Sequence, residues 1–366
     1  KQEGFGLMDT TIFDGKRQST SVTYLHPIKQ RQNLTLITNI QVSKIIIENS
    51  SAIGVEIKNK NKLEKIFIEK EVLLSAGAIN SPQILMLSGV GPEEELKKHG
   101  INVISALNGV GENLQDHLET YVQYECTKPV TLYSSFNPIN MALIGMQWFL
   151  FKKGIAAHSN LEIGGFIRTN EMVDYPNMQY HFFPSLVIDH GRQNPSCHAF
   201  QAHVGPMRPT SRGFVKLKSS NPIDSPRIQF NYMQTEHDLN EMREGIKIAR
   251  NIFHQKAFDH YRGKEISPGE NINSDDGLNN FIRSKGDTAY HPSCTCKMGN
   301  DDMSVVDQNL KVYGVEKLRV VDASIMPNIV SGNLNATTVM IAEKASDLIQ
   351  NKITAEKVNI EFYKAS

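Results

Sequence analysis

The sequence predicts an α/β protein with a second domain built on an antiparallel sheet, and three observations support this. A short apolar strand at residues 71–77 ends in small residues and leads into a helix. A second strand–loop–helix unit occupies residues 318–349. Between them, over residues 120–286, apolar and polar residues alternate as they do in half-buried antiparallel strands. The length of 366 residues fits about two domains of ordinary size.

The composition is typical of globular proteins and argues against a polyanion as a partner. Apolar residues make up 40% and charged residues 21% of the chain, and 39 basic residues balance 39 acidic ones. With no block of like charge, we expect no nucleic-acid partner. The longest apolar runs, residues 84–91 and 141–151, are too short to span a bilayer. The four cysteines are too few for a disulfide framework.

The first 70 residues are expected to be rich in strands. Asp14-Gly15 is a turn signal between two strand-like segments. The lysine-rich stretch 58–62 is expected to be a solvated hairpin tip rather than an anion site. The predicted strands cover residues 10–13, 21–25, 34–37, 43–48, 52–57 and 65–68.

The segment 71–91 is the first that indicates a function. The strand 71–77 ends in Ala76-Gly77, and Ser81 and Pro82 suit an N-cap and a first helical position, so a helix is predicted from Gln83 to Leu87. A strand, a bend of small residues and a helix N-terminus allow a dinucleotide or flavin to approach the backbone closely. An ordinary strand–helix corner explains the same pattern, and both interpretations stay open here.

The next segment closes this α/β part without a dinucleotide fingerprint. A short helix is predicted over residues 92–100 and a strand over 101–105. Three Gly-x-Gly pairs begin at Gly4, Gly89 and Gly109, and none has the third glycine of Gly-x-Gly-x-x-Gly.

The middle of the chain is predicted to be a sheet covered by a long helix. Residues 178–183, 199–204 and 213–218 alternate as strands. The helix should begin at the N-cap Thr235, with Asp238 three residues later, and carry one apolar face.

The C-terminal part returns to the α/β pattern. A buried strand over residues 318–324 carries Asp322 near its end, and Asn335 is expected to cap the helix that follows a loop. An acid at a strand end beside an incoming helix N-terminus again suits a nucleotide cofactor.

Residues 289–299 form the richest chemical cluster. Pro292 biases His291 toward an extended backbone, so its imidazole is expected to project from a loop, where it could act as the general base for an alcohol. His291, Cys294 and Cys296 could instead bind a metal, although Cys-x-Cys is a poor spacing for one zinc ion. A hydrogen-bonded loop histidine beside two buried thiols is the third interpretation.

Several of these segments resemble one enzyme family. Residues 77–83, 291–299 and 320–327 are similar to the glucose–methanol–choline (GMC) oxidoreductases, which oxidise alcohols with FAD. The resemblance runs from about Gly4 to about Lys352 and is closest to the choline-oxidising branch of the family. The segments that resemble this branch are 109–119, 187–192, 203–208 and 331–337.

The resemblance implies a reaction and a set of site residues. It implies oxidation of choline to betaine aldehyde, with His291 taking the alcohol proton as hydride passes to flavin N5, and with Asn335 as the second catalytic residue. His190 corresponds to a polar residue of the choline pocket. Glu162 corresponds to an acid that faces the quaternary ammonium, a cation that needs a carboxylate or aromatic faces. A surface glutamate is an equal alternative for Glu162.

The resemblance also implies a cofactor, an electron acceptor and a location. No metal is expected, and electrons would pass from FAD to a respiratory quinone at the matrix side of the mitochondrial inner membrane, with possible peripheral membrane association. Besides Asn335, the positions that correspond to FAD contacts in the family are Val42, Ala76, Gly77, Asp322, Ala323, Ala336 and Thr337.

One departure from the family is large. Family members begin with a strand–Gly-x-Gly-x-x-Gly–helix unit, which this sequence lacks, so we expect a C-terminal portion that is inactive alone. The rival hypotheses are a flavoprotein that oxidises a neutral primary alcohol or sugar, and a non-catalytic fragment. The expected divisions are a partial FAD-binding domain at 1–119, a substrate-binding domain at 120–286, a returning FAD-binding and active-site segment at 287–353, and a tail at 354–366.

Overall fold

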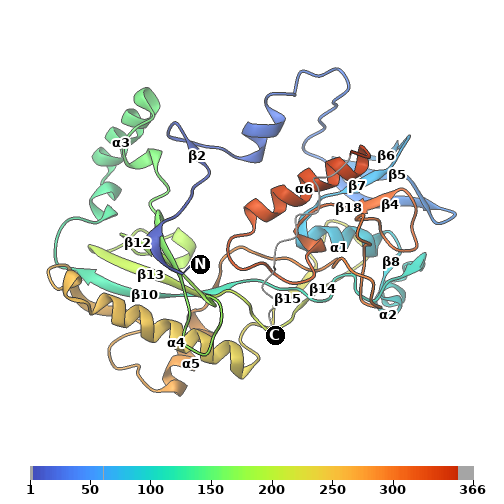
Figure 1. The fold of residues 1–366 in the computed structure, drawn as a ribbon. Helices are drawn as coiled ribbons and strands as arrows, with labels where there is room; N and C mark the ends of the chain where they lie inside the picture. Colours follow the sequence, from blue (N-terminus) through green and yellow to red (C-terminus); the bar gives the residue numbers. More distant parts are fainter. Residues whose placement is uncertain (1–2, 61, 353–366) are drawn as a thin grey trace. The chain divides into compact units, whose positions relative to one another are not determined.

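The structure, a computed structural model, describes residues 3–60 and 62–352, so the predicted tail lies outside the described residues. The chain forms two compact units that alternate along the sequence (Figure 1). We call the first the sheet unit; it comprises residues 3–39, 116–211 and 231–291. The second, the α/β unit, comprises the described residues of 40–115, 212–230 and 292–352.

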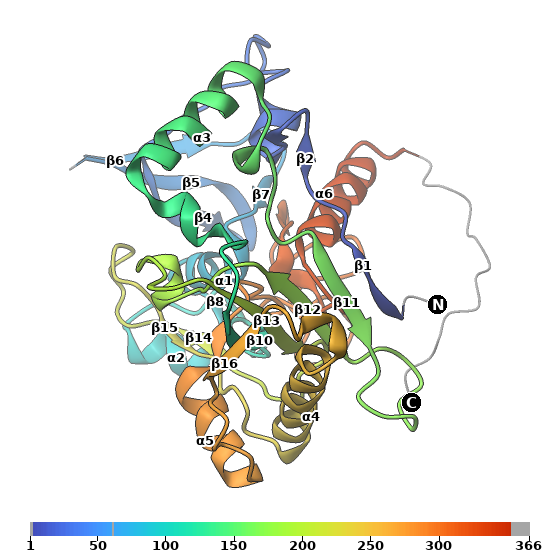
Figure 2. The same ribbon diagram turned by 90° about the vertical axis from the view of Figure 1, so that its left-hand side faces the viewer.

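The sheet unit is built on one antiparallel sheet of seven strands. Short β17 (Asp287–Thr288) pairs with the start of β10. Figure 2 shows β1 beside β11 at one edge. The order across the sheet is β1 (Gly4–Leu7), β11 (Ile163–Ile167), β12 (Met178–Phe183), β13 (Ala199–Pro206), β10 (Leu118–Cys126) and β16 (Arg262–Ser267).

The helices α4 (Glu236–Phe253) and α5 (Asp275–Lys285) pack on one face of this sheet (Figure 1). Strand side chains such as Val122 and Tyr180 are buried against Met242 and Ile246 of α4. As predicted, α4 begins after Thr235, whose hydroxyl accepts a hydrogen bond from the main-chain N–H of Asp238 over 3.2 Å.

The other face of the sheet is polar, because side chains alternate between the faces of a strand. We call it the polar face. Residue pairing places Tyr121, His203 and His181 in one row across β10, β13 and β12. Its members are Glu119, Tyr121, Gln123, Gln179, His181, Gln201 and His203.

The α/β unit combines two parallel strand pairs with two antiparallel sheets. In the parallel pairs, β7 (Val72–Leu74) lies beside β18 (Leu318–Val320), and β8 (Val90–Gly91) beside β9 (Ser105–Ala106). The antiparallel sheets are β4 (Gln41–Glu48), β5 (Ser51–Asn59) and β6 (Lys62–Phe67), and β14 (Phe214–Lys216) with β15 (Arg227–Gln229). Its helices are α1 (Gly77–Leu87), α2 (Glu93–Lys98) and α6 (Asn335–Ile349).

The core of the α/β unit forms around α1, which is buried along most of its length. Leu85 and Met86 are fully buried and share a core with Val320 of β18 and with Cys294 and Cys296. The predicted strand–helix element at 71–91 and the predicted strand at 318–324 therefore exist and lie together, but the strands are shorter than predicted, at Val72–Leu74 and Leu318–Val320.

The apolar run at 141–151 forms α3 (Pro138–Phe151), all of whose side chains are at least partly exposed. Trp148 of α3 donates from its indole nitrogen to the carbonyl of Gly15 over 2.7 Å. Within residues 3–60 and 62–352, no helix combines the length and the apolar character that crossing a membrane requires. The short helical turns are η1 (Ser21–Leu25), η2 (Leu132–Phe136), η3 (Ile155–Ala157), η4 (Asp189–Gly191), η5 (Lys256–Phe258) and η6 (Ala323–Ile325).

The N-terminal strands were predicted only in part. The turn at Asp14-Gly15 joins β2 (Ile12–Phe13) to β3 (Lys16–Arg17), with φ of 48° and 65° at the turn residues, as a type I′ hairpin requires. Residues 21–25 form the helical turn η1 and residues 34–37 form no strand, so both strand predictions are wrong. Val22 and Tyr24 are exposed, without the half-buried surface that makes an alternating segment a strand.

Two predicted helix starts are also wrong. The helix α1 begins at Gly77 rather than Gln83, and Pro82 lies inside it. The Ser81 hydroxyl does not cap the helix, because it donates to the Asp322 carboxylate and accepts from the main-chain N–H of Ala76. Asn335 is the first residue of α6 rather than its cap.

Candidate active site

The loop that carries His291 is attached to the first strand residues of β10. Thr288 of β17 pairs with Leu118, and the main-chain N–H of Ala289 donates to the carbonyl of His117 over 2.9 Å. Tyr290 then has φ of 61°, the left-handed conformation that turns the chain sharply before His291. The expectation that a loop presents the His291 imidazole is confirmed.

Asp116 fixes the backbone of this loop. Its Oδ1 accepts the main-chain N–H of His291 over 2.8 Å, and its Oδ2 accepts the hydroxyl of Thr288 over 2.5 Å and that of Tyr232. Burial raises the pKa of Asp116, and these three hydrogen bonds oppose that rise. The carboxylate thereby sets the position from which the His291 side chain projects.

The imidazoles of His117 and His291 form a direct pair. Their Nδ1 atoms lie 3.0 Å apart and the rings are nearly perpendicular, at 88°. The Nε2 of His117 lies 3.0 Å from the carbonyl oxygen of Met207. Burial, and then the charge that His291 can carry, lower the pKa of His117 to about 4. His117 is therefore neutral at physiological pH.

His291 is suited to accept a proton. Burial lowers the pKa of His291 from its usual value of 6.5, and the nearby carboxylates of Asp116 and Glu119 oppose this shift. Its ring is consequently neutral near pH 7, which a general base must be before it can act.

A hydrogen-bonded network covers the polar face. Glu119 accepts hydrogen bonds from Nδ1 of His203 over 2.9 Å and from the Tyr121 hydroxyl over 3.1 Å. Burial alone would raise the pKa of Glu119, but these hydrogen bonds, chiefly that from His203, bring it below its usual value. Burial, and next the neighbouring His203, lower the pKa of His181 to about 4. The face thus presents one carboxylate that His203 and Tyr121 hydrogen-bond, with a neutral His181 nearby.

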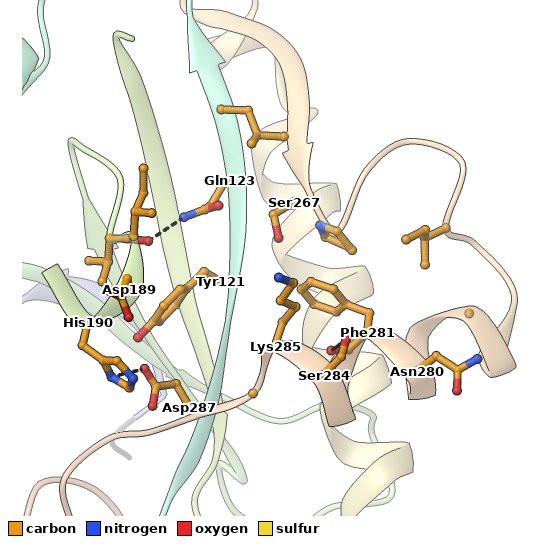
Figure 3. Close-up of a pocket in the computed structure, with 17 residues that line it drawn as sticks. Tyr121, Gln123, Asp189, His190, Ser267, Asn280, Phe281, Ser284, Lys285 and Asp287 are labelled. Carbon is orange, nitrogen blue, oxygen red and sulfur yellow. Dashed lines mark hydrogen bonds and ion pairs between the residues drawn. The ribbon is translucent and has the colours of Figure 1, made fainter. Parts of the chain in front are cut away.

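A pocket of about 980 Å³ opens between β10, α5 and residues 187–190 (Figure 3). The predicted residue His190 lines it, and its Nδ1 pairs with Asp287 over 2.7 Å. The Tyr290 hydroxyl lies 3.3 Å from the same nitrogen. His190 is therefore linked to the neighbour of His291, while Tyr121 connects the pocket to the polar face.

Glu162 lies just before β11, near the edge of the same sheet. Its carboxylate pairs with Nδ1 of His158 over 2.8 Å, and the side chain is 40% exposed. The structure gives Glu162 a cationic partner of its own when His158 is protonated, so its predicted role toward a substrate cation stays a prediction.

In the α/β unit, Asp322 joins the two predicted cofactor segments. One of its oxygens accepts the main-chain N–H of Gly77 over 2.9 Å and the Ser81 hydroxyl over 2.6 Å. The other accepts the N–H of Ser324 over 2.8 Å. Gly77 has φ of 82°, and no atom lies within 4 Å of the place where a Cβ would be. The backbone there is open to close approach by a ligand.

The N-termini of α1 and α6 share two features that suit the carbonyl and phosphate oxygens of a flavin cofactor. Neither helix has an acidic residue in its first turn or a hydrogen bond to the side chain of its own N-cap residue, although the Asp322 carboxylate accepts the Gly77 N–H at the start of α1. By contrast, α4 and α5 have both. The N–H groups of a first helical turn that have no partner within the helix, together with the helix dipole, favour anionic or carbonyl ligands. The predicted residues Ala76 and Gly77 lie at the first terminus, Asn335, Ala336 and Thr337 at the second, and Val42, Asp322 and Ala323 in the same unit.

The two cysteines after His291 are core residues of the α/β unit. Cys294 and Cys296 are fully buried. Burial raises the pKa of Cys294 to about 11 and raises that of Cys296 further, so both remain thiols at neutral pH. Across the part of the chain that the structure describes, no three acidic, cysteine or histidine side chains gather as a metal site would require.

The sequence analysis missed most of the residues around His291. Asp116 and His117 lay in the segment 109–119, which carried the resemblance, but neither had a role assigned. A period of two along β10 and β13 was the signal for Glu119 and His203, since it placed polar residues on one face. His291 and Asn335 belong to different units, each of which the structure describes by itself.

Comparisons with known proteins identify the family. Two family profiles described as GMC oxidoreductase match residues 1–119 and 209–342. The mitochondrial choline dehydrogenases of Mus musculus and Homo sapiens are each 51% identical over all 366 residues, and the chain spans 61% and 62% of their lengths. An oxygen-dependent choline dehydrogenase of Acinetobacter baumannii (strain AYE) is 50% identical over 370 aligned residues, with 67% of its length covered.

Solved structures agree with the fold. A formate oxidase of Aspergillus oryzae RIB40, studied for its FAD modification, has a TM-score of 0.90 at 25% identity, with 96% of this chain and 66% of that chain covered. A pyridoxine 4-oxidase has a TM-score of 0.84 at 27% identity, covering 96% of this chain and 65% of that chain.

The two units, the profile matches and the relatives lead to one assignment. Both the α/β unit and the sheet unit occur in the matched flavoprotein structures, and the resemblance to choline dehydrogenases seen in the sequence extends over the whole chain. The predicted GMC oxidoreductase fold is confirmed, and FAD is the cofactor of the family. The chain belongs to the GMC oxidoreductase family.

Proposed function

We propose that the protein takes part in FAD-dependent oxidation of choline to betaine aldehyde, with His291 as the base. The observation that carries this proposal is His291 itself, a half-buried loop histidine that is neutral near pH 7 and held by Asp116 and His117. The match to choline dehydrogenases over the full chain supports the substrate.

The reaction divides between the cofactor and the chain. Bound FAD supplies the hydride acceptor, its N5 atom, while the C–H bond of the alcohol carbon breaks. His291 accepts the hydroxyl proton as the carbonyl forms. Asn335 would hydrogen-bond the substrate oxygen and orient it. Because Asp116 fixes the His291 backbone, the base does not need to be ordered when substrate binds.

The remaining predicted residues would bind substrate and cofactor. His190 lies in the pocket beside Tyr290 and would contact the substrate there. Glu162 would face the quaternary ammonium. The open N-termini of α1 and α6, with Gly77 and Thr337, would hold part of the FAD, and Val42, Ala76, Asp322, Ala323 and Ala336 complete the proposed contacts.

We further infer that electrons leave the reduced flavin to a respiratory quinone and that the protein acts in mitochondria, at the matrix side of the inner membrane. The mitochondrial names of the mouse and human relatives support the compartment. Bacterial relatives that are named oxygen-dependent make oxygen the alternative acceptor. Comparing quinone reduction with hydrogen peroxide release in one assay distinguishes the two.

The function is tested by anaerobic titration of the flavin-loaded protein. If residues 1–366 do not retain FAD, a strand–Gly-x-Gly-x-x-Gly–helix segment is fused before residue 1 for this and later tests. We expect choline to bleach the flavin absorbance and to yield betaine aldehyde. A protein whose flavin is bleached by neutral primary alcohols or sugars and not by choline would contradict the proposed substrate.

A further inference from the structure

The hydrogen-bond partners of His117 determine which ring of the His117–His291 pair carries the hydrogen between them. The Nε2 atom of His117 is 3.0 Å from the carbonyl oxygen of Met207. A carbonyl oxygen only accepts hydrogen bonds, so Nε2 of His117 must carry a hydrogen. This holds whichever way the neighbouring ring is protonated.

His117 carries only that one ring hydrogen. Its side chain is almost fully buried, with 5% of the residue exposed, and a neutral imidazole has a single N–H. Its Nδ1 then has no hydrogen and carries a lone pair. This nitrogen lies 3.0 Å from Nδ1 of His291. The hydrogen between the two rings must therefore belong to His291.

We propose that His117 is a positioning residue that keeps the proton of neutral His291 on Nδ1, so that Nε2 of His291 is the atom that accepts the substrate proton. This inference rests on the proposed role of His291 as the base. It identifies Nε2 of His291 as the basic atom. The ring is oriented by a series of hydrogen bonds that runs from the Met207 carbonyl through His117 to His291.

The carboxylates of Asp116 and Glu119 near the pair have hydrogen-bond partners of their own. Asp116, on the adjoining segment, is engaged by Thr288, Tyr232 and the His291 backbone. Glu119 on β10 binds His203 of β13 and Tyr121, and His181 of β12 is neutral. Both ring nitrogens of His117 are already used by Met207 and His291.

The energetic role of such a pair is known in principle. A hydrogen bond at one nitrogen of a histidine sets which nitrogen is protonated and which is the base. Removing the hydrogen-bond partner that orients a metal-binding histidine typically costs about 10- to 100-fold in metal affinity or activity, and we expect a loss of the same order for a catalytic histidine. Since Asp116 would still hold the His291 backbone, we expect the loss to appear in kcat and not in KM.

The variants separate positioning from simple packing. His117→Leu fills the buried space with an apolar side chain of similar size, but leucine has no acceptor for the His291 proton. His117→Gln can donate from its amide nitrogen to the Met207 carbonyl and accept with its amide oxygen from His291. We expect kcat for choline to fall about 10- to 100-fold in His117→Leu and to recover at least in part in His117→Gln. His254→Leu is the matched control, since this exposed helix-end histidine hydrogen-bonds the Arg250 carbonyl of its own helix and lies outside the His117–His291 pair.

The deciding measurement determines which ring nitrogen of each histidine carries the proton, and it does not require catalytic turnover. Two-bond proton–nitrogen spectra of the histidine-labelled protein, with His117→Gln and His291→Asn used for assignment, report the tautomer of each ring. We expect His291 to be protonated at Nδ1 and His117 at Nε2, and His291 to become a mixture in His117→Leu. A wild-type His291 protonated at Nε2 would overturn the inference even if choline is oxidised. If the protein has the predicted tautomers but does not oxidise choline, the positioning role of His117 is supported and the proposed function is contradicted.

Discussion

The main-chain N–H of His291 donates to Oδ1 of Asp116 over 2.8 Å, although 175 positions separate the two residues in the sequence. The same carboxylate accepts the hydroxyls of Thr288 and Tyr232 through its other oxygen. One buried side chain therefore joins the start of β10, the segment before α4 and the His291 loop. The position of the proposed base depends on this carboxylate as much as on its own sequence.

Asp116→Asn should destabilise the protein and reduce its activity. The amide loses one of the two acceptor oxygens and places a donor opposite two hydroxyl groups, and leaving buried polar groups poorly paired costs about 1–3 kcal/mol. We expect a lower midpoint in urea unfolding and a lower kcat, with His291 still present. Asp259→Asn, which changes an exposed carboxylate on Arg262, is the control. Equal stability of the two variants would contradict the role of Asp116.

His291→Ala should remove most of the catalytic activity while flavin stays bound. General-base contributions are typically about 10²–10⁴-fold, so we expect kcat/KM for choline to fall by at least about a hundredfold. Cys294→Ser and Cys296→Ser should cost far less, because both thiols pack in the core of the α/β unit. Steady-state kinetics and the flavin spectrum provide the comparison. A His291→Ala variant within about threefold of wild type would show that the base is another group.

The pH profile should show its acid limb below pH 6.5. Burial lowers the pKa of His291 below 6.5, so the neutral form of the base predominates above that pH and is lost as the pH falls through the lowered value. We therefore expect kcat/KM for choline to fall to half of its maximum at a pH below 6.5, the usual pKa of a histidine. A half-maximal point above pH 7 would mean that a different group, or a solvated His291, controls proton transfer.

The elements that the sequence predicted correctly depend on neighbours in the chain. The start of α4 follows from the Thr235 side chain and a main-chain N–H three residues later, and the β2–β3 turn follows from Asp14-Gly15. The alternation along β12 and β13 follows from one buried face. Each signal lies within a few residues of the structure it specifies.

The features that the sequence analysis missed depend on distant residues. Ser81 has the right composition for an N-cap, but Asp322, 241 positions away, takes its hydroxyl, and α1 begins four residues earlier. In the same way, His117 lies in a segment with no periodic signal, and only the folded chain brings its ring to His291. Local propensity cannot specify such pairs, because the deciding partner lies in another element.

Glu162→Gln should distinguish a substrate contact from a structural ion pair. If Glu162 faces the trimethylammonium group, KM should rise for choline and much less for its uncharged isostere 3,3-dimethylbutanol. A charged hydrogen-bonding or ionic partner contributes about 1.5–3 kcal/mol, equivalent to about one to two decades in affinity. His158→Gln is the control, since it removes the observed partner and leaves the carboxylate. The same rise in KM for both alcohols would assign Glu162 to the structure of the sheet edge.

Residues 1–366 expressed alone should not retain FAD, even though the proposed contacts of the α/β unit are present. The open N-termini of α1 and α6 can bind part of the cofactor, but the sequence contains no Gly-x-Gly-x-x-Gly turn for the pyrophosphate. The chain spans 61% of the length of the mouse relative. In addition, β7 and β18 form a parallel sheet of only two strands among the described residues, and Leu73 is 47% exposed there. Parallel strands are usually buried between neighbours, so we also expect low solubility.

The measurement is an absorbance spectrum after purification in excess FAD and desalting. A fusion that places a strand–Gly-x-Gly-x-x-Gly–helix segment before residue 1 is the matched comparison, and we expect it to keep flavin while residues 1–366 lose it. Gly77→Ala in the fusion should weaken retention, because an alanine at φ of 82° is strained and its Cβ would enter the open space beside the α1 N-terminus. Stoichiometric flavin on residues 1–366 alone, bleached by choline, would show that the two helix N-termini are sufficient to hold the cofactor.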